Sequence, residues 1–454
     1  MTHRTRRMLY LTFVAAFFII TPLVILYANG YQLNPNKRTL TITGMLILDT
    51  KPQGATISLN NQKQESLVNQ FFGLGSSIGT PAKIKNQIPG EYLVKMEKPG
   101  YWPWEKKLQI LPGQSTYAED VILFKKALPE KIVGDTTDYI ISPDSNHLAL
   151  IAKNSIEILD PLSLAIVVKY PVQAKTVRWS PDSKNLIVNK QIFSLATDTP
   201  LFDLNKTIGK NGTNFKWHDT DSNTVFYQQD NQLFSFDTLS GTSRKISLPE
   251  QTNNSVKGAK LADYSISNGI AYFAFAKNAG VQIIGYDIDT AKTVREFHLN
   301  ASNELAFTDW TNGSIGLVDK KNHDLFIFNL SGYSPLADTI NNYSGGEWVG
   351  KNKLLIWSDS EISVYETDLK QKNILTRLGK PIKQASWHPS GNYIIYTTDG
   401  SLTTLELDDR EKHLTIDLLK GQKINSFYIK PDAKSLYFAG TIDSSPGFYN
   451  LQLQ

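Results

Sequence analysis

The chain has 454 residues, of which 41% are hydrophobic, 20% are charged and none is cysteine. The lack of cysteine excludes disulfides, thiolate metal sites and cysteine nucleophiles, and the length allows two or three domains. Residues 1–128 hold 15 Lys and Arg against 7 Asp and Glu, whereas the remaining 326 residues hold 32 against 36. The larger C-terminal part therefore has no basic excess, which argues against nucleic acid as a partner.

The N-terminus carries a long apolar segment. Three arginines precede an uncharged run from residue 8 to residue 28. As a helix, this run would span about 30 Å, the thickness of the hydrocarbon core of a bilayer. Since arginines favour the cytoplasmic side, we expect a basic cytoplasmic N-terminus (1–7), a single transmembrane helix (8–28) and an extracytoplasmic linker (29–43). A cleaved signal peptide is the alternative, although Ala28-Asn29-Gly30 is a poor cleavage site.

Residues 44–124 alternate short apolar runs with Pro- and Gly-containing turns, which is typical of β-strands. In "EYLVKM", Tyr92, Val94 and Met96 would share one buried face of a strand. The segment also contains, in this order, Thr50-Lys51-Pro52-Gln53-Gly54-Ala55, Thr80-Pro81, Pro89-Gly90-Glu91-Tyr92, Lys98-Pro99-Gly100-Tyr101 and Val121-Ile122-Leu123. In these residues it resembles the PEGA family, which implies a small β-sandwich attached to bacterial envelope proteins, without catalytic residues.

An insertion within this segment mimics a catalytic motif. Residues 75–79 read Gly-Ser-Ser-Ile-Gly and match the G-x-S-x-G pattern of serine hydrolases. That chemistry requires a helix directly after the serine, so that the hydroxyl is held on a strained turn. Thr80-Pro81 follows at once, and no helical periodicity begins there. We therefore interpret the motif as a loop.

A repeated phrase organises the rest of the chain. An aromatic or aliphatic residue followed by a turn recurs at a period near 41 residues, and each unit divides into four short strands. This period is typical of β-propeller blades, in which the recurring residue would fill the gap between neighbouring blades. The recurring residues are Ile141, Trp179, Trp217, Ile266, Trp310, Trp348, Trp387 and Ile429.

The repeat resembles TolB-like and WD-repeat-like propellers, most closely at Trp179-Ser180-Pro181-Asp182. Eight recurrences predict eight blades over residues 125–454, with seven as the alternative if the irregular fourth unit is an insertion. The last unit ends after its third strand, and residues 127–134 read as a strand without a partner in their own repeat. Pairing these two segments would close the ring and remove its exposed edges. The expected fold class is thus all-β apart from one transmembrane helix, with a small sandwich followed by a propeller.

The propeller sequence contains no catalytic motif. His218 and His388 occupy the same repeat position, where we expect polar turn residues rather than ligands or acid–base groups. Asp219-x-Asp221-x-Asn223 mimics the start of a calcium loop but lacks the glycine that the loop requires at its sixth position. Turn capping accounts for the recurrent carboxylates of Asp144, Asp182 and Asp432. We assign no catalytic residue, metal ligand or cofactor.

These observations favour a non-enzymatic role over an enzymatic one. We expect an anchored bacterial envelope protein whose propeller binds or scaffolds a protein or a cell-surface glycan. The alternatives are a hydrolase or lyase that acts on envelope glycans or peptides from the central channel, and a purely structural assembly platform. A cluster of ionisable groups converging at the channel would favour the enzyme, because propeller channels gather side chains from several blades without a linear motif.

Overall fold

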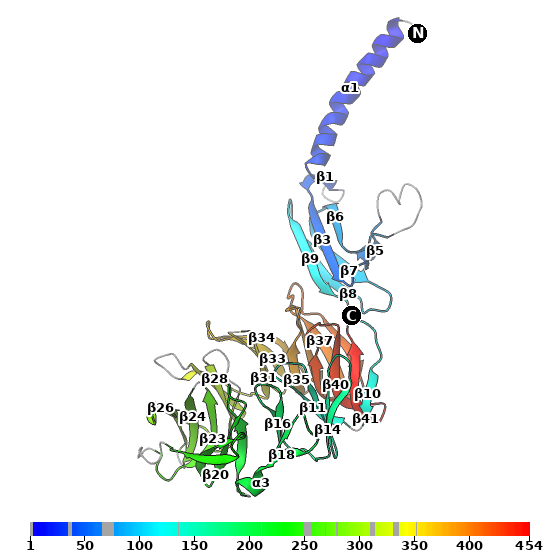
Figure 1. The fold of residues 1–454 in the computed structure, drawn as a ribbon. Coiled ribbons are helices and arrows are strands. Elements are labelled where there is room, and N and C mark those ends of the chain that lie inside the picture. The colour runs from blue at the N-terminus through cyan, green and yellow to red at the C-terminus, as the bar shows by residue number, and fades with distance from the viewer. Residues whose placement is uncertain are drawn as a thin grey trace.

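The computed structural model describes residues 3–454 except 35–38, 66–76, 135, 210, 249–255, 268, 278–279, 309–313, 330–335 and 351. A long helix, a small β unit and a large ring of sheets follow one another along the chain (Figure 1). The protein is therefore mostly β, with one N-terminal apolar helix, as the sequence predicts.

The helix α1 spans His3–Ala28 and begins before the apolar run. Its segment Thr5–Ala28 has a mean hydropathy of 2.5 and is not covered by other parts of the protein, so it is long and apolar enough to cross a membrane; a signal sequence has the same properties. The next residues, expected to form a linker, contain an antiparallel hairpin of β1 (Tyr31–Asn34) and β2 (Thr39–Ile42). Period-2 alternation in these two short segments is the signal for the hairpin.

The small β unit consists of two sheets that enclose one core. One sheet has the order β6-β3-β9 and the other the order β5-β4-β7-β8. Val94 and Met96 are fully buried between the sheets and Tyr92 packs against their cluster, so these three residues share a face as predicted. The strands are β3 (Gly44–Lys51), β4 (Thr56–Leu59), β5 (Gln62–Lys63), β6 (Ala82–Gln87), β7 (Gly90–Glu97), β8 (Trp104–Ile110) and β9 (Ser115–Ile122).

The G-x-S-x-G motif does not form a nucleophile elbow in its described part. Gly75 and Ser76 lie outside the described residues, whereas Ser77 and Gly79 form isolated β-bridges with Glu65 and Thr56. No helix follows Ser77, since the chain continues into β6. Ser77 therefore lacks the strand–turn–helix setting that a serine nucleophile requires.

The described residues form eight further four-stranded antiparallel sheets, which we number as blades 1 to 8. Blade 1 contains β11 (Thr136–Ile141), β12 (Leu148–Ala152), β13 (Ile156–Leu159) and β14 (Ile166–Tyr170), and blade 2 contains β15 (Val177–Trp179), β16 (Asn185–Val188), β17 (Gln191–Ser194) and β18 (Pro200–Asp203), followed by the short helix α3 (Leu204–Thr207). Blade 3 contains β19 (Thr213–Trp217), β20 (Thr224–Gln229), β21 (Gln232–Asp237) and β22 (Thr242–Ile246). Blade 4 contains β23 (Lys260–Ser267), β24 (Ile270–Lys277), β25 (Gly280–Asp287) and β26 (Lys292–Leu299). The irregular fourth unit is thus a full sheet rather than an insertion.

Blades 5 to 7 repeat the same meander. They contain β27 (Leu305–Phe307), β28 (Ser314–Asp319), β29 (Asp324–Asn329) and β30 (Leu336–Ile340); β31 (Gly345–Val349), β32 (Lys353–Trp357), β33 (Glu361–Glu366) and β34 (Gln371–Arg377); and β35 (Ile382–Trp387), β36 (Tyr393–Thr398), β37 (Ser401–Glu406) and β38 (Thr415–Lys420). Blade 8 combines β39 (Lys423–Ile429), β40 (Ser435–Ile442) and β41 (Ser445–Gln452) with β10 (Glu130–Gly134), which precedes blade 1 in the chain.

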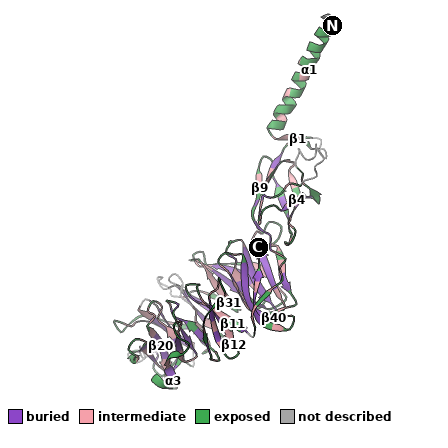
Figure 2. Ribbon diagram, turned by 45° about the vertical axis from the view of Figure 1, so that its right-hand side comes forward, coloured by how far each residue is buried: buried purple, intermediate pink, exposed green. Residues whose placement is uncertain are grey.

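The blades close into a ring. β10 pairs antiparallel with β41, so the first strand of this region completes the last blade, as the sequence predicts. Every consecutive pair of blades shares an apolar cluster, and one cluster joins blade 8 to blade 1 through Tyr437, Phe448 and Leu148. Buried residues accordingly run through the middle of the sheets (Figure 2). A closed ring of four-stranded antiparallel meanders is the β-propeller architecture.

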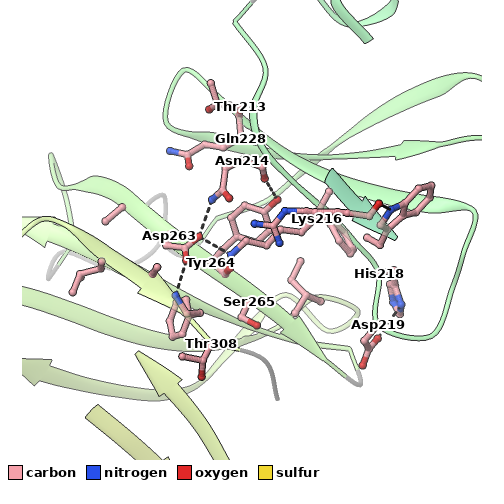
Figure 3. A pocket seen from close by; sticks show the side chains of 18 of the residues that line it. Thr213, Asn214, Lys216, His218, Asp219, Gln228, Asp263, Tyr264, Ser265 and Thr308 are labelled. Carbon is pink, nitrogen blue, oxygen red and sulfur yellow. Dashed lines mark hydrogen bonds and ion pairs between the residues drawn. The ribbon is translucent and has the colours of Figure 1, made fainter. Parts of the chain in front are cut away.

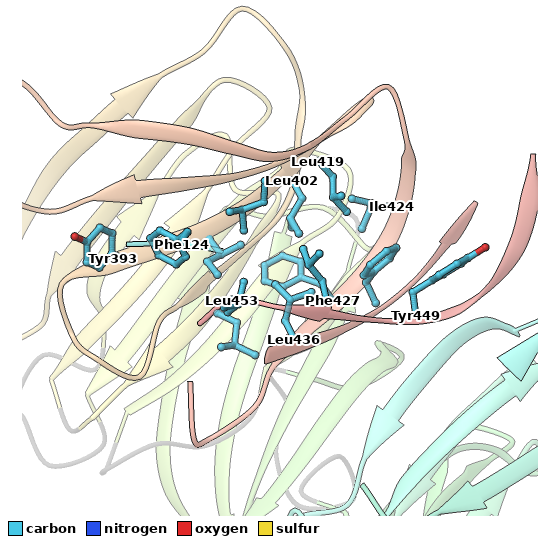
Figure 4. Packing of buried hydrophobic residues seen from close by; sticks show 14 of the residues in the cluster. Phe124, Tyr393, Leu402, Leu419, Ile424, Phe427, Leu436, Tyr449 and Leu453 are labelled. Atoms are coloured by element: carbon cyan, nitrogen blue, oxygen red, sulfur yellow. The ribbon is translucent and has the colours of Figure 1, made fainter. Parts of the chain in front are cut away.

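The small β unit is fixed to blades 7 and 8. Phe124, which follows β9, is fully buried in a cluster with Tyr393, Phe427 and Leu453 (Figure 4). Beside it, Lys106 Nζ lies 2.6 Å from Glu406 Oε2, and these side chains are only 1% and 5% exposed. A buried ion pair is favourable only when its geometry is good and further hydrogen bonds satisfy the charged groups. This pair therefore favours one orientation of the small β unit on the ring.

Candidate functional site in the central channel

The recurring residues lie between the blades. Trp179, Ile266 and Ile429 are buried, and Ile141, Trp217, Trp348 and Trp387 are half-buried, whereas Trp310 lies outside the described residues. Each of these seven belongs to, or packs against, the apolar cluster that its blade shares with the preceding blade. The indole N–H groups of Trp179 and Trp217 also donate hydrogen bonds to backbone carbonyls in the first strand of the preceding blade.

In blade 2 the turn after the recurring residue is stabilised by its own side chains. Ser180 Oγ donates to Asp182 Oδ1 at 2.6 Å and accepts from the Asn185 N–H at 2.9 Å. Burial would raise the pKa of Asp182, but the hydrogen bonds from Ser180, Lys184 and Ser222 outweigh burial and lower this pKa. The carboxylate is therefore a turn cap, held ionised by donors of the turn.

His218 and His388 take the place of that serine in their own turns. His218 Nδ1 accepts from the backbone N–H groups of Thr220 and Asp221 at 3.2 Å, and His388 Nδ1 accepts from the Ser390 N–H at 3.2 Å. In both turns the ring nitrogen thus accepts backbone hydrogen bonds, as the serine hydroxyl does in blade 2. His388 is fully buried, and burial lowers its pKa to about 4.

The calcium-like sequence also serves its own turn. Asp221 Oδ1 accepts from the Asn223 N–H at 2.9 Å, and Asp221 Oδ2 accepts from the Thr224 hydroxyl at 2.5 Å. The Thr224 hydrogen bond is the main reason that the pKa of Asp221 is lowered. No group of three or more His, Asp or Glu within the described residues has the arrangement of a metal site.

The first strands of neighbouring blades contact one another, so they line the axis of the ring. Along these strands, side chains alternate between the core and the channel. Residues one and three positions before a recurring residue face the channel, as Lys216 and Asn214 do before Trp217, while the residue between them, Phe215, is buried. The same offset places Arg178 at the channel in blade 2.

A cavity of about 970 Å³ opens where blades 2 to 5 meet the channel. Its wall comes mainly from the first strands β15, β19, β23 and β27, with the turns of blades 2 and 3 at one side (Figure 3). The charged residues in the lining are Arg178, Lys216, Asp219, Lys260, Asp263 and Lys320. Among the described lining residues, four cations therefore face two carboxylates, although the propeller sequence as a whole is slightly acidic.

Asp263 is the centre of this wall and joins three blades. Its Oδ1 accepts from Lys216 Nζ and from Asn214 Nδ2, both at 2.7 Å, and its Oδ2 accepts from the Phe307 N–H at 2.7 Å. The carboxylate is almost fully buried, as its side chain is 7% exposed. Both oxygens are thus engaged by the wall, which is the arrangement of a structural clamp.

Tyr264 lies beside this carboxylate on the core side of β23. Its hydroxyl donates to the Asn214 carbonyl at 2.6 Å, and Lys216 Nζ lies 4.8 Å from its ring centroid. Complete burial, together with the nearby charge of Asp263, raises the pKa of Tyr264 well above its usual value. The phenol therefore stays neutral and serves as a donor and a cation–π surface.

Arg178 is a channel-facing cation that no described carboxylate neutralises. Its side chain is exposed, and among the described residues the guanidinium makes no hydrogen bond or ion pair. The charge lies close enough to lower the pKa of Tyr264, against the dominant effect of burial. The Trp217 indole fixes the Arg178 backbone by donating to its carbonyl at 3.2 Å. The cavity thus presents an exposed guanidinium whose five N–H donors are not used by the described residues.

In the remaining blades, the described channel-facing side chains are mostly uncharged and form hydrogen bonds with neighbouring first strands. Gln384 Nε2 donates to the Phe427 carbonyl and Gln384 Oε1 accepts from the Phe427 N–H, both at 2.9 Å. Glu347 accepts from the Trp387 N–H at 3.3 Å, and its burial raises its pKa. The cationic character is therefore confined to the side formed by blades 2 to 5.

No family model matches the sequence, and no curated protein matches it. Solved structures are similar in fold: a eukaryotic initiation factor shares 13% identity over 73% of this chain and 91% of that chain, with a TM-score of 0.48. Dihydro-heme d1 dehydrogenase NirN shares 12% identity over 72% and 81%, with a TM-score of 0.49. Hydrazine synthase from Kuenenia stuttgartiensis shares 13% identity over 71% and 97%, with a TM-score of 0.37. These values transfer no activity to this chain.

Proposed function

We propose that this chain is a single-pass protein of the bacterial cell membrane whose extracytoplasmic propeller binds a partner protein or a cell-surface glycan without catalysing a reaction. In this proposal the N-terminus is cytoplasmic, residues 44–124 form a PEGA-like spacer, and residues 125–454 form a TolB-like or WD-repeat-like propeller. The apolar helix, the arginines before it and the small β unit after it support this arrangement.

We favour binding over catalysis because both carboxylate oxygens of Asp263, at the channel, already accept hydrogen bonds. A general base must reach a substrate proton through a free oxygen, but both oxygens of Asp263 are held by donors from blades 3 and 5. Arg178 in contrast presents free donors to the cavity. Because the lining carries four cations and two carboxylates, we expect the bound segment to be anionic.

Retention on isolated envelopes tests this proposal. The full-length chain in detergent should sediment with envelopes, and an Arg178→Glu variant should be retained less because it reverses the charge in the cavity. Retention that survives protease treatment of the envelopes would identify a glycan, whereas loss of retention would identify a protein. Lack of retention of the unmodified chain would refute a binding role on this surface.

The ionisable groups of the cavity also provide the one observation that favours an enzyme. Lys216, Asp263 and Tyr264 converge within one wall, as a channel-based hydrolase or lyase would require. Incubation of the full-length chain with envelope glycans and peptides, followed by mass spectrometry, tests this second candidate. Turnover that is lost in Asp263→Asn would replace the binding proposal. A structural platform would instead give self-association in sedimentation velocity without retention on envelopes.

A further inference from the structure

The hairpin that follows the membrane helix has one apolar face and one polar face. β1 and β2 pair so that Leu33 lies opposite Leu40 and Tyr31 lies opposite Ile42. Directly opposed residues in an antiparallel pair project to the same face, and side chains alternate along each strand. The four apolar residues therefore share one face, which we call the apolar hairpin face. The intervening residues Gln32, Thr39 and Thr41 belong to the other face.

The apolar hairpin face is open rather than packed against the protein. Leu33 is 65% exposed, Leu40 is 58% exposed and Ile42 is 38% exposed. The hairpin is a separate two-stranded sheet that pairs with no other described strand. A lone two-stranded ribbon is marginally stable in water and needs a surface that covers its apolar side.

The position of the hairpin identifies that surface. β1 begins three residues after α1 ends at Ala28, and it lies beside the base of the helix (Figure 1). Gly30 fixes the base of the hairpin, because its carbonyl accepts from both the N–H and the hydroxyl of Thr43 at 2.7 Å. The Asn86 amide also donates to the Tyr27 hydroxyl at 3.1 Å and so ties the helix end to the small β unit. The hairpin is therefore held where the chain leaves the apolar helix.

We propose that the apolar hairpin face lies in the boundary between headgroups and acyl chains of the membrane that α1 crosses. The inference rests on the proposed function in one respect, namely that α1 spans a bilayer. Amphipathic segments at such an interface bury their apolar face by about 5–10 Å, and tyrosine is favoured at this depth. Leu33 and Leu40 would then contact lipid, and Tyr31 would lie near the headgroups.

The lack of cysteine makes this depth directly measurable. A full-length Leu40→Cys variant carries a single thiol, which can be labelled with the fluorophore NBD and reconstituted into phosphatidylethanolamine–phosphatidylglycerol vesicles that contain nitroxide-labelled lipids. Thr39→Cys is the matched control on the opposite face of the same strand, and Leu369→Cys is an exposed control on blade 6. All three positions are exposed, so the substitutions remove no core contact.

We expect NBD at position 40 to shift its emission to shorter wavelength and to lose most of its intensity to the nitroxide lipids. The label at position 39 should be quenched less, and the label at position 369 should not be quenched. Equal, weak quenching at positions 39, 40 and 369 in a chain that floats with the vesicles would overturn the inference while leaving the anchor intact. Failure to float would overturn both. A blue shift at position 40 that appears in detergent and grows with protein concentration would assign the face to a second copy, and would also overturn the inference.

Discussion

The buried imidazole of His388 should make the stability of the propeller fall in mild acid. His388 is fully buried in the turn of blade 7, beside the rings of Phe124 and Tyr393, whose centroids lie 6.0 and 6.3 Å away. Burial lowers its pKa from 6.5 to about 4, an effect that the nearby Ala433 backbone partly offsets. At a pH between these two pKa values, His388 is protonated in the unfolded chain but not in the folded chain.

The sign and size of the effect follow from this difference. Because the folded pKa is the lower one, the stability contributed by neutral His388 is fully present above about pH 6.5 and is lost as the pH falls toward 4. A shift of this size corresponds to about 2 to 3 kcal/mol between pH 7 and pH 4.5. Asn at position 388 keeps a polar turn acceptor but does not titrate, so His388→Asn should remove this part of the pH dependence.

Urea unfolding followed by tryptophan fluorescence, at several pH values, measures the difference between the two proteins. The variant should be less stable than the unmodified chain at pH 7, because it loses ring packing, and the gap should narrow by about 2 to 3 kcal/mol at pH 4.5. The carboxylates of the protein contribute equally to the pH dependence of unfolding in both proteins, so their contributions cancel in the comparison. A gap that stays constant with pH would refute the reasoning, since it would mean that His388 is protonated alike in the folded and unfolded states.

Substitutions at three further places, namely the Lys106–Glu406 pair, Asp263 and Gly440, test the clamps and the packing of the ring. Lys106→Met should lower the free energy of unfolding by about 3–5 kcal/mol, because it leaves Glu406 buried without its cation. The double variant Lys106→Met/Glu406→Gln should recover part of that loss in thermal unfolding. Equal losses in the two variants would show that Lys106 and Glu406 are not coupled. Asp263→Ala should cost about 3 kcal/mol, because it leaves buried donors of two neighbouring blades unpaired, whereas Asp263→Asn should cost less. Gly440→Ala should cost about 1–3 kcal/mol, since a Cβ there would lie 2.4 Å from the Lys423 carbonyl oxygen; an unchanged midpoint would show that the strand shifts freely.

Much of the ring could be predicted from the sequence because each blade repeats the same local solution. A recurring apolar residue, a tight turn and a short apolar strand return at a regular period, and the partnerless strand before blade 1 has one available edge, on blade 8. These features depend on local patterning and on the need to remove open sheet edges. The sequence also contains the alternation of β1 and β2, but each alternating run is only four residues long, and from the sequence alone we expect a linker there.

The channel wall and the junction with the small β unit depend on contacts that no local pattern encodes. Asn214 and Asp263 are 49 residues apart, yet each lies three positions before a recurring residue. Alignment of the repeats on that residue would therefore have placed both at the channel, although not their hydrogen bond. Lys106 and Glu406 are 300 residues apart and belong to different folding units, so nothing in their spacing indicates a pair.

The strand pairing between β10 and β41 has a consequence for folding during synthesis. A bond such as that from Lys131 to Ser445 joins positions 314 residues apart, so β10 is made early and has no partner until nearly all of blades 1 to 8 has been synthesised. During that time the strand edges of blade 1 and β10 stay available for wrong pairing. Pairing across so long a loop is slow, which makes this interval long relative to the folding of a single blade. Folding of this chain should therefore depend on chaperones that shield strand edges until the ring closes.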